Sequence, residues 1–274
     1  MVVRAEQGGG WEVVRGPGPG GVELVGYRDR AGRGLDMPVL PQPGLTIVLV
    51  LDGELRIERS GPVTAGIVSG VGVNSVRVHG RDVACVDVHL SPLAAYSVLD
   101  GAVAELAGTV AGFEDLWGAE ARRLRGALAG AGRWEERFAE LRAALAGRMH
   151  AGRSVDPEVA FVWHGLVASG GRRRTSDLAA ETGWSRKRLW SRFKAQIGVT
   201  PKRAAMIVRL SPAIDAIMAG TAPAEVAARY GYADQPHLTR DLRELAGYTP
   251  ASLYRAWAGD QAAPGGTFVQ DAAG

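Results

Sequence analysis

The chain has 274 residues, of which 46% are hydrophobic and 22% charged, and its net charge at pH 7 is +3. This composition excludes a chain that is disordered throughout, and the length exceeds the roughly 100 to 200 residues of one domain, which predicts two domains. The longest apolar run, residues 47–51, is far shorter than the roughly 20 residues that span a bilayer, and the N-terminus lacks a secretory signal. We therefore expect a cytoplasmic protein without a membrane contact.

The positive charge is concentrated in the C-terminal part of the chain. Residues 151–257 contain 16 Lys and Arg against 9 Asp and Glu, which is a net charge of +7. Residues 1–150 contain 16 against 18, a net charge of −2, and the segment after residue 257 adds Asp260 and Asp271. A local excess of this kind is the electrostatic footprint of a nucleic-acid-binding domain.

The N-terminal half is predicted to be a small β-barrel or sandwich. Residues 1–20 are rich in Gly and Pro and should form a flexible, irregular segment, apart from a candidate short strand at residues 11–14. The Asp52-Gly53 pair predicts a hairpin, because such a pair adopts the positive φ angles of a tight turn. The β-branched runs between turn residues predict strands at residues 22–27, 46–51, 54–58, 63–68, 73–78 and 83–90.

Covalent and metal chemistry has little support in this sequence. The single cysteine, Cys85, excludes an internal disulfide and a zinc site built from several cysteines, and its apolar neighbours predict a buried thiol. The predicted barrel contains only His79 and His89, expected on different strands, which is not the pattern of a metal site. The sequence also lacks a Gly-rich phosphate loop and a Gly-x-Ser-x-Gly turn. We therefore expect no cofactor, no metal and no enzymatic activity.

Three helices are expected to complete the N-terminal domain, at residues 92–100, 114–129 and 134–149. The last of them has an apolar stripe at helical spacing, made by Phe138, Leu141, Leu145 and Met149. This stripe can pack in the domain's own core or form a homodimer contact. Asp156-Pro157 then predicts the start of a further helix, with Asp as N-cap and Pro at the first position, so the domain boundary falls at residues 151–156.

An internal repeat in roughly the last hundred residues carries the functional signal. Asp-Leu-Ala-Ala-Glu-Thr-Gly at residues 177–183 recurs as Glu-Val-Ala-Ala-Arg-Tyr-Gly at residues 225–231. Gly-Val-Thr-Pro at residues 198–201 recurs as Gly-Tyr-Thr-Pro at residues 247–250. In each copy a short helix packs through its alanines, and a glycine in the left-handed conformation ends it before a second helix starts.

The second helix of each copy has its own start and stop signals. Ser185 and Asp234 are expected to cap these helices, and Gly198 and Gly247 to end them. Apolar side chains at helical spacing face inward, so the side chains between them point outward. A short helix, a glycine turn and a second helix with an exposed basic face make a helix-turn-helix, whose second helix enters the major groove.

Two such copies, joined by a helix predicted over residues 201–218, resemble the DNA-binding domain of the AraC/XylS family across residues 154–257. Gly-Tyr-Ala-Asp-Gln at residues 231–235 and Gly-Tyr-Thr-Pro at residues 247–250 are the closest matches. The resemblance implies two helix-turn-helix units whose recognition helices address successive major grooves on one face of the DNA. It also implies a cupin-like N-terminal domain for effector binding or dimerisation.

The expected fold is therefore a two-domain α+β chain. A flexible segment at residues 1–20 precedes a barrel-like domain with C-terminal helices at residues 21–150, and an all-α DNA-binding domain at residues 154–257 precedes a disordered tail at residues 258–274. The chain departs from the family pattern at two positions. Pro212 should kink the linking helix, and Leu242 stands where the family often has an aromatic residue.

The outward positions of the two recognition helices are the candidate DNA contacts. In the first helix the residues expected to reach base edges or phosphates are Arg186, Lys187, Trp190 and Ser191, beside the phosphate partners Arg188 and Lys194. In the second helix the matching residues are Gln235, Pro236, His237 and Arg240. The capping residues Ser185 and Asp234, at the starts of the two helices, are candidate DNA contacts as well. An arginine can read guanine bidentately for about 1 to 3 kcal/mol of discrimination, and Gln235 can read adenine.

We therefore expect a sequence-specific DNA-binding transcription regulator. Activation is the commoner behaviour of the family that the chain resembles, so contact with RNA polymerase is expected as well as binding to double-stranded DNA. The N-terminal domain would bind a small-molecule effector or form a homodimer. A ligand-independent regulator or antagonist, whose β domain makes only protein contacts, is the alternative, and a closed apolar pocket with a few convergent polar groups would favour the effector.

Overall fold

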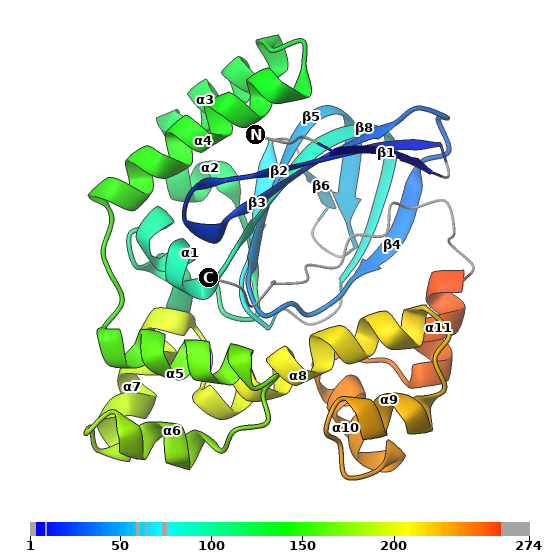
Figure 1. Ribbon diagram of the computed structural model, residues 1–274. Coiled ribbons are helices and arrows are strands. Elements are labelled where there is room, and N and C mark those ends of the chain that lie inside the picture. Colours follow the sequence, from blue (N-terminus) through cyan, green and yellow to red (C-terminus); the bar gives the residue numbers. More distant parts are fainter. Residues whose placement is uncertain (1–3, 9, 59–60, 64, 73–75, 259–274) are drawn as a thin grey trace.

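The computed structural model describes residues 4–8, 10–58, 61–63, 65–72 and 76–258 (Figure 1). An antiparallel sheet and the helices beside it form an N-terminal β domain, and the helices from Pro157 onward form a helical domain. The two-domain α+β prediction is confirmed. Of the tail that was predicted to be disordered, residues 259–274 lie outside the described residues.

The β domain contains one sheet whose strands pair in the order β1-β2-β3-β8-β5-β7-β9, with β4 beside β8 and β6 beside β5. Its strands are β1 (Arg4–Gly8), β2 (Trp11–Pro17), β3 (Glu23–Asp29), β4 (Leu35–Val39), β5 (Leu45–Ile57), β6 (Gly61–Val63), β7 (Gly66–Ser69), β8 (Val76–Leu90) and β9 (Val110–Gly112). Among these strands, β1 and β9 end the path without pairing to each other. The sheet is curved but open, so the barrel-like domain that was predicted does not close into a complete barrel.

The curvature arises where the two longest strands bend together. The pairing of β5 with β8 shifts register on both sides of Asp52, Gly53 adopts φ +78°, and Asp82 opposite it adopts φ +52°. The hairpin predicted at Asp52-Gly53 is therefore wrong, because the positive φ makes a bulge within one continuous strand. The strands predicted on either side of residues 79–82 likewise form the single strand β8. Beyond the bend, the outer halves of β5 and β8 pair with β6 and β4.

The N-terminal segment is ordered by the sheet. Irregular chain was expected over most of residues 1–20, but β2 pairs with β3 along its whole length and β1 pairs with β2. Trp11 and Val14 supply the reason, since their side chains are buried at 2% and 3% exposure. Burial of large apolar side chains outweighs the low strand propensity of the surrounding glycines.

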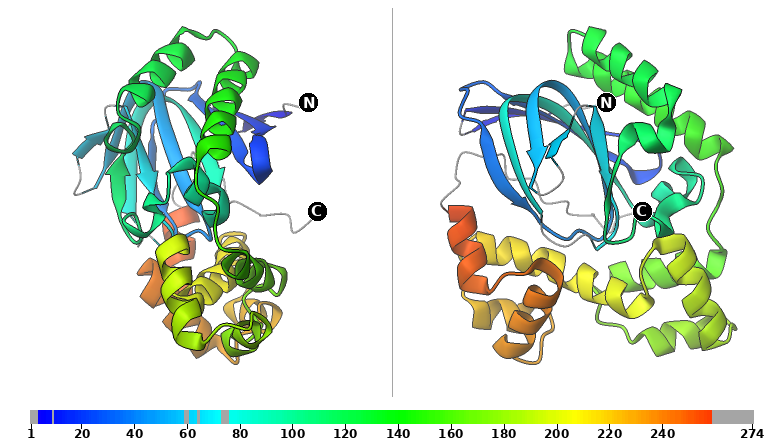
Figure 2. Two further views of the ribbon diagram at one scale, coloured as in Figure 1. Left: turned by 90° about the vertical axis from the view of Figure 1, so that its left-hand side faces the viewer. Right: turned by 180° about the vertical axis from the view of Figure 1, so that it is seen from behind.

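Helices cover one face of the sheet (Figures 1 and 2). They are α1 (Pro92–Val98), α2 (Phe113–Trp117), α3 (Ala119–Gly130) and α4 (Trp134–Ala151), with a short 3₁₀ turn η2 (Ala102–Ala104). Gly118, at φ +55°, divides the helix that was predicted over residues 114–129 into α2 and α3. On α4, Phe138, Leu141 and Leu145 are almost completely buried in the chain's own core. The apolar stripe therefore packs inside this domain and does not offer a dimer surface.

The helical domain consists of α5 (Pro157–Ala168), α6 (Thr175–Glu181), α7 (Arg186–Ile197), α8 (Pro201–Met218), α9 (Pro223–Arg229), α10 (Gln235–Ala246) and α11 (Pro250–Ala258). The linking helix α8 has the predicted bounds and runs between the two helix-turn-helix units (Figure 1). It continues through Pro212, whose ring is exposed to solvent. Within the described residues, none of the helices has the length and apolar character needed to cross a membrane.

The β domain contacts each helix-turn-helix unit through a different element. The first unit packs against α1 and η2 through α7, while α11, which follows the second unit, packs against β4. Figure 2 shows the helical domain below the open end of the sheet. A change in the β domain can therefore act on either unit.

Candidate nucleic-acid interface and cavity

The two helix-turn-helix units are built by the same local interactions. Ser185 Oγ accepts a hydrogen bond of 3.3 Å from the Arg188 amide, and Asp234 Oδ1 accepts one of 2.7 Å from the His237 amide. The predicted N-caps of both recognition helices are confirmed. Gly198 and Gly247 end these helices in the left-handed conformation, at φ +92° and +75°.

The first recognition helix, α7, buries one side and exposes the other. Leu189 and Phe193 are fully buried, so the predicted inward face is confirmed. The exposed side chains between and beside them include Arg186, Lys187, Arg188, Ser191 and Lys194. Trp190 is half-buried, and the Arg186 guanidinium lies 5.1 Å from its ring centre.

The second recognition helix, α10, presents three of its four candidate side chains to solvent. Gln235, Pro236 and Arg240 are exposed near the start of the helix. His237 is half-buried instead, with Nε2 3.8 Å from Asp241 Oδ1 and its ring edge-on to that of Tyr232 at 5.2 Å. The His237 side chain therefore packs against its own domain.

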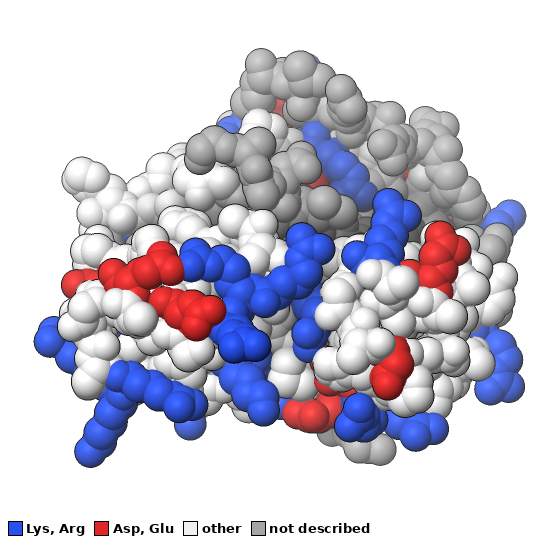
Figure 3. Space-filling view, turned by 60° about the horizontal axis from the view of Figure 1, so that its bottom comes forward, with Lys and Arg blue, Asp and Glu red and all other residues white. Residues whose placement is uncertain are grey.

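Basic side chains gather on the surface of the helical domain. Figure 3 shows a group of Lys and Arg in the middle of this face, with acidic side chains on both sides of it. The exposed basic residues of the helix-turn-helix units include Arg186, Lys187, Arg188, Lys194, Arg240 and Arg243. This charge suits a phosphate backbone, which binds such surfaces with a strong dependence on salt.

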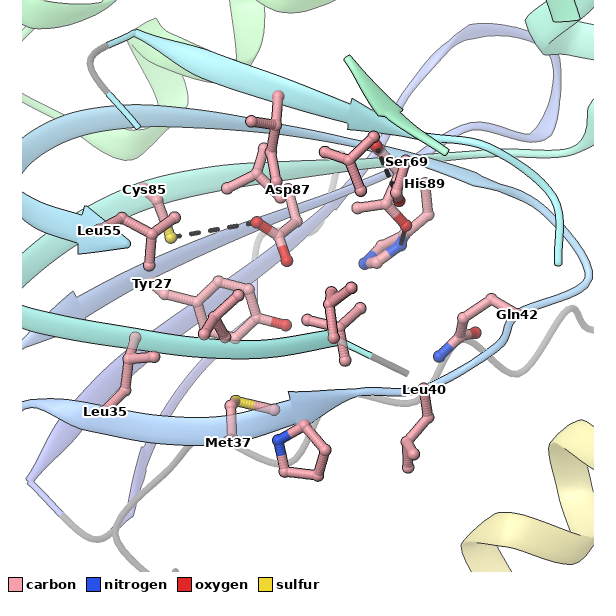
Figure 4. Close-up of a pocket in the computed structure, with 18 of the residues that line it drawn as sticks. Tyr27, Leu35, Met37, Leu40, Gln42, Leu55, Ser69, Cys85, Asp87 and His89 are labelled. Carbon is pink, nitrogen blue, oxygen red and sulfur yellow. Dashed lines mark hydrogen bonds between the residues drawn. The ribbon is translucent and has the colours of Figure 1, made fainter. Parts of the chain in front are cut away.

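A cavity of about 160 Å³ lies between the β domain and the helical domain. Side chains of the sheet form most of its wall, among them Tyr27, Leu35, Met37, Leu55, Cys85 and Asp87 (Figure 4). Met218, at the end of α8, and Trp257, on α11, complete the wall from the helical domain. The cavity therefore touches both domains.

Successive side chains of β8 point alternately into the cavity and into the core. Cys85, Asp87 and His89 line the cavity, while Val86 and Val88 are buried in the core beneath the helices. Cys85 is a buried free thiol, as predicted. His79 and His89 belong to this one strand, which corrects their expected placement on two strands, and the described residues contain no group of three or more metal-ligating side chains.

Burial shifts the pKa of each of three titratable groups in the cavity in the direction that favours its uncharged form. Burial raises the pKa of Asp87 to about 7, and Cys85 Sγ lies 4.0 Å from Asp87 Oδ1. Burial, together with Arg15, lowers the pKa of His89 to about 4, and His89 Nδ1 lies 3.2 Å from Thr46 Oγ1. Burial also raises the pKa of the Tyr27 hydroxyl, with a further contribution from Asp87.

Residues 178–256 match the family model of a helix-turn-helix domain. This part of the chain is a helix-turn-helix domain. In sequence, no curated protein matches the chain. Among solved structures it is similar to ToxT from Vibrio cholerae O395, at 12% identity and a TM-score of 0.46 over 87% of this chain and 99% of that chain.

Two further solved structures are similar to this chain. ToxT from Vibrio cholerae strain SCE256 with bound unsaturated fatty acid has 12% identity and a TM-score of 0.45, over 87% of this chain and 95% of that chain. The AraC-like transcriptional activator CuxR has 17% identity and a TM-score of 0.36, over 77% of this chain and 82% of that chain.

The second helix-turn-helix unit is held by residues that sequence reasoning missed. Arg209 of α8 donates a hydrogen bond of 3.0 Å to Asp241 Oδ2 on α10, and its guanidinium lies 4.6 Å from the Tyr232 ring centre. Asp241 is only 7% exposed. A buried acid inside a recognition helix was the available signal, because such a group needs a cation nearby.

The first unit has a corresponding ion pair. Arg192 of α7 donates two hydrogen bonds to the carboxylate of Asp156, at 2.6 and 2.9 Å. Asp156 has the N-cap position of α5, as predicted, but its side chain makes no capping bond. The hydrogen bond from Arg192 lowers the pKa of Asp156. Asp156 therefore joins α7 to α5.

Proposed function

We propose that this chain is an AraC-type regulator, a sequence-specific transcription activator that places α7 and α10 in two successive major grooves of double-stranded DNA. The observation that carries the proposal is the pair of matching helix-turn-helix units on one continuous helix, α8. Because α8 packs against both units, it sets the distance and angle between the two recognition helices. Two readers at a set distance recognise a bipartite site about one helical turn, roughly 10 bp, apart.

Individual residues take different parts in this proposal. Ser185 and Asp234 cap and orient the two recognition helices. The residues that read bases are Arg186, Lys187, Gln235 and Arg240, with Pro236, Trp190 and Ser191 beside them. Arg188 and Lys194 bind phosphates, so they supply affinity that depends on salt rather than sequence discrimination. His237 supports α10 through Asp241 and reaches DNA only at the edge of this set.

The cavity favours an effector over the ligand-independent alternative. It is apolar with a few convergent polar groups, which is the form of a small-molecule site. A molecule bound there would touch Met218 and Trp257, and so bias the position of α8 and α11 relative to the sheet. Contact with RNA polymerase, a homodimer, a cytoplasmic location and the absence of enzymatic activity complete the proposal.

DNA selection from a random library by the full chain tests this function. The wild type should enrich a bipartite motif, and Arg186→Ala and Arg240→Ala should each relax a different half of it. Arg123→Ala, which removes an exposed arginine of α3, is the matched control and should leave the motif intact. Binding that is unselective and only salt-sensitive would contradict the proposal.

A further inference from the structure

The wall of the cavity is mainly apolar and contains an acidic side chain but no basic one among the described residues. Its wall includes many apolar and aromatic side chains, and its polar side chains are Tyr27, Gln42, Thr46, Ser69, Asp87 and His89. Of these side chains, only Asp87 can ionise in the neutral pH range and so carry a formal charge. No Lys or Arg is found among the described residues that line the cavity.

Asp87 is the polar centre of this wall. It lies near the C-terminal end of β8 between its cross-strand neighbours Val25 of β3 and Val48 of β5, and its carboxylate points into the cavity (Figure 4). Protein atoms enclose the group on its other sides, so its remaining exposed surface faces the cavity. The thiol of Cys85, at 4.0 Å, is a weak donor and leaves the carboxylate with acceptor capacity to spare.

The other titratable groups around Asp87 do not supply a cation. His89 on β8 and Tyr27 on β3 stay neutral at pH 6 to 8, because burial moves the pKa of His89 down to about 4 and that of Tyr27 up. Burial also raises the pKa of the Cys85 thiol, which keeps it protonated. Arg15 of β2 pairs with Glu23 at 3.3 Å, and neither residue lines the cavity.

A second polar group in the cavity also needs a donor. The Gln42 side-chain oxygen is buried and has no hydrogen-bond partner. Unpaired buried polar groups are costly, so a ligand that donates a hydrogen bond to Gln42 stabilises the site, and the indole N–H of Trp11, which is also buried without a partner, can donate to an acceptor on the same ligand. Trp11, Tyr27 and Trp257 add aromatic rings, which attract cations.

We propose that the cavity binds a small, mainly apolar molecule that carries a protonated amine, and that the amine pairs with Asp87. The inference rests on the proposed effector role of the cavity and names its ligand class. The volume of about 160 Å³ is close to that of a cavity of about 150 Å³ that holds benzene, so one ring with a short substituent fits. At pH 8 a carboxylate of the same size would face the ionised Asp87 without a cation between them, and like-charge repulsion disfavours its binding.

Ligand binding should then depend on pH through Asp87. The carboxyl, with a pKa of about 7, is mostly protonated at pH 6 and must release its proton before it pairs with an ammonium group. At pH 8 it is already ionised. Affinity for an amine should therefore rise about tenfold from pH 6 to pH 8, with about 0.9 protons released per ligand at pH 6.

Calorimetric titration of the full chain with benzylamine, benzyl alcohol and benzoate tests the proposal. At pH 8 benzylamine should bind at least about tenfold more tightly than benzyl alcohol, and benzoate should not bind. Asp87→Asn should remove this preference and the proton release. Asp82→Asn makes the same change on the same strand at an exposed position with positive φ, which Asn tolerates, and should keep both.

The outcomes separate this inference from the proposed function. Benzoate or benzyl alcohol binding as well as benzylamine, no binding of benzylamine at millimolar concentration, or an unchanged preference in Asp87→Asn would each overturn the ligand class. DNA selection with the same protein is measured in parallel. A bipartite DNA motif without amine preference refutes only the ligand class, whereas amine preference without a DNA motif refutes only the proposed function.

Discussion

Arg209 on α8 is hydrogen-bonded to Asp241 on α10 at 3.0 Å, so the helix that links the two helix-turn-helix units also holds the second recognition helix. The pair is largely enclosed, with side-chain exposures of 17% and 9%. His237 and Tyr232 pack around it on the same unit. The orientation of α10 is therefore tied to α8 by a charged contact as well as by apolar packing.

Arg209→Ala should lower the free energy of unfolding of the full chain by about 2 to 3 kcal/mol, because it leaves the carboxylate of Asp241 buried without its cation. Chemical denaturation measures this loss. Arg203→Ala is the matched control, since Arg203 also joins α8 to α10 but pairs with exposed Glu244 at 3.7 Å. That change should cost less than about 1 kcal/mol. Equal losses for the two variants would show that burial of the pair does not matter.

Lys194→Ala and Gln235→Ala should weaken DNA binding in different ways. Loss of a phosphate contact at Lys194 lowers affinity for all sequences alike and reduces the slope of log K against log salt by about 1. Loss of an adenine reader at Gln235 costs about 1 to 3 kcal/mol for the selected motif and little for other sequences. Binding to selected and scrambled duplexes over a salt series distinguishes them, and identical behaviour of the two variants would contradict these roles.

Asp87→Asn should stabilise the protein without ligand at pH 8. The pKa of Asp87 is raised in the folded chain from 3.8 to about 7, so the folded state binds more protons than the unfolded state between these values, and stability falls as pH rises through this range. The full pKa shift corresponds to roughly 4 kcal/mol of stability lost at pH 8. Hydration of Asp87 from the cavity reduces this loss to about 2 kcal/mol.

Thermal melts of Asp87→Asn and wild type at pH 4 to 8 check this sign. The two curves should coincide near pH 4 and separate above it, with Asp87→Asn the more stable. His89, whose pKa falls to about 4, contributes equally to both curves and cancels in the difference. A difference that shrinks with rising pH would refute the raised pKa.

Gly53→Ala should destabilise the β domain strongly. A Cβ at Gly53 would lie 2.3 Å from the Asp82 carbonyl oxygen, and φ +78° is itself unfavourable for alanine. We expect a loss of about 3 kcal/mol or more in chemical denaturation. Gly108→Ala separates the two causes, because Gly108 has φ +71° but no atom within 4 Å of the added Cβ, and it should cost only about 1 kcal/mol. Similar losses for both would show that the close approach of β5 to β8 is unimportant.

The sequence by itself determined the helix-turn-helix units and the linking helix. Their signals are local: Ser185 and Asp234 cap helices within three residues, and glycines with positive φ end them. Such interactions form within one or two turns of chain, so their spacing can be read directly. The repeat added a second copy of every signal, and the bounds of α8 (Pro201–Met218) followed from it.

Only the tertiary structure decided how the strands of the β domain pair and where its cavity lies. A hairpin and a bulge both need positive φ at Gly53, and the pairing of β5 with β8 on both sides of it selected the bulge. The cavity depends on still more distant contacts, because Asp87 on β8 meets a wall completed by Met218 and Trp257. Local sequence propensity does not indicate which surfaces will pack together when their residues are more than a hundred positions apart in the chain. Packing of the two domains makes that choice, since it alone buries these surfaces together.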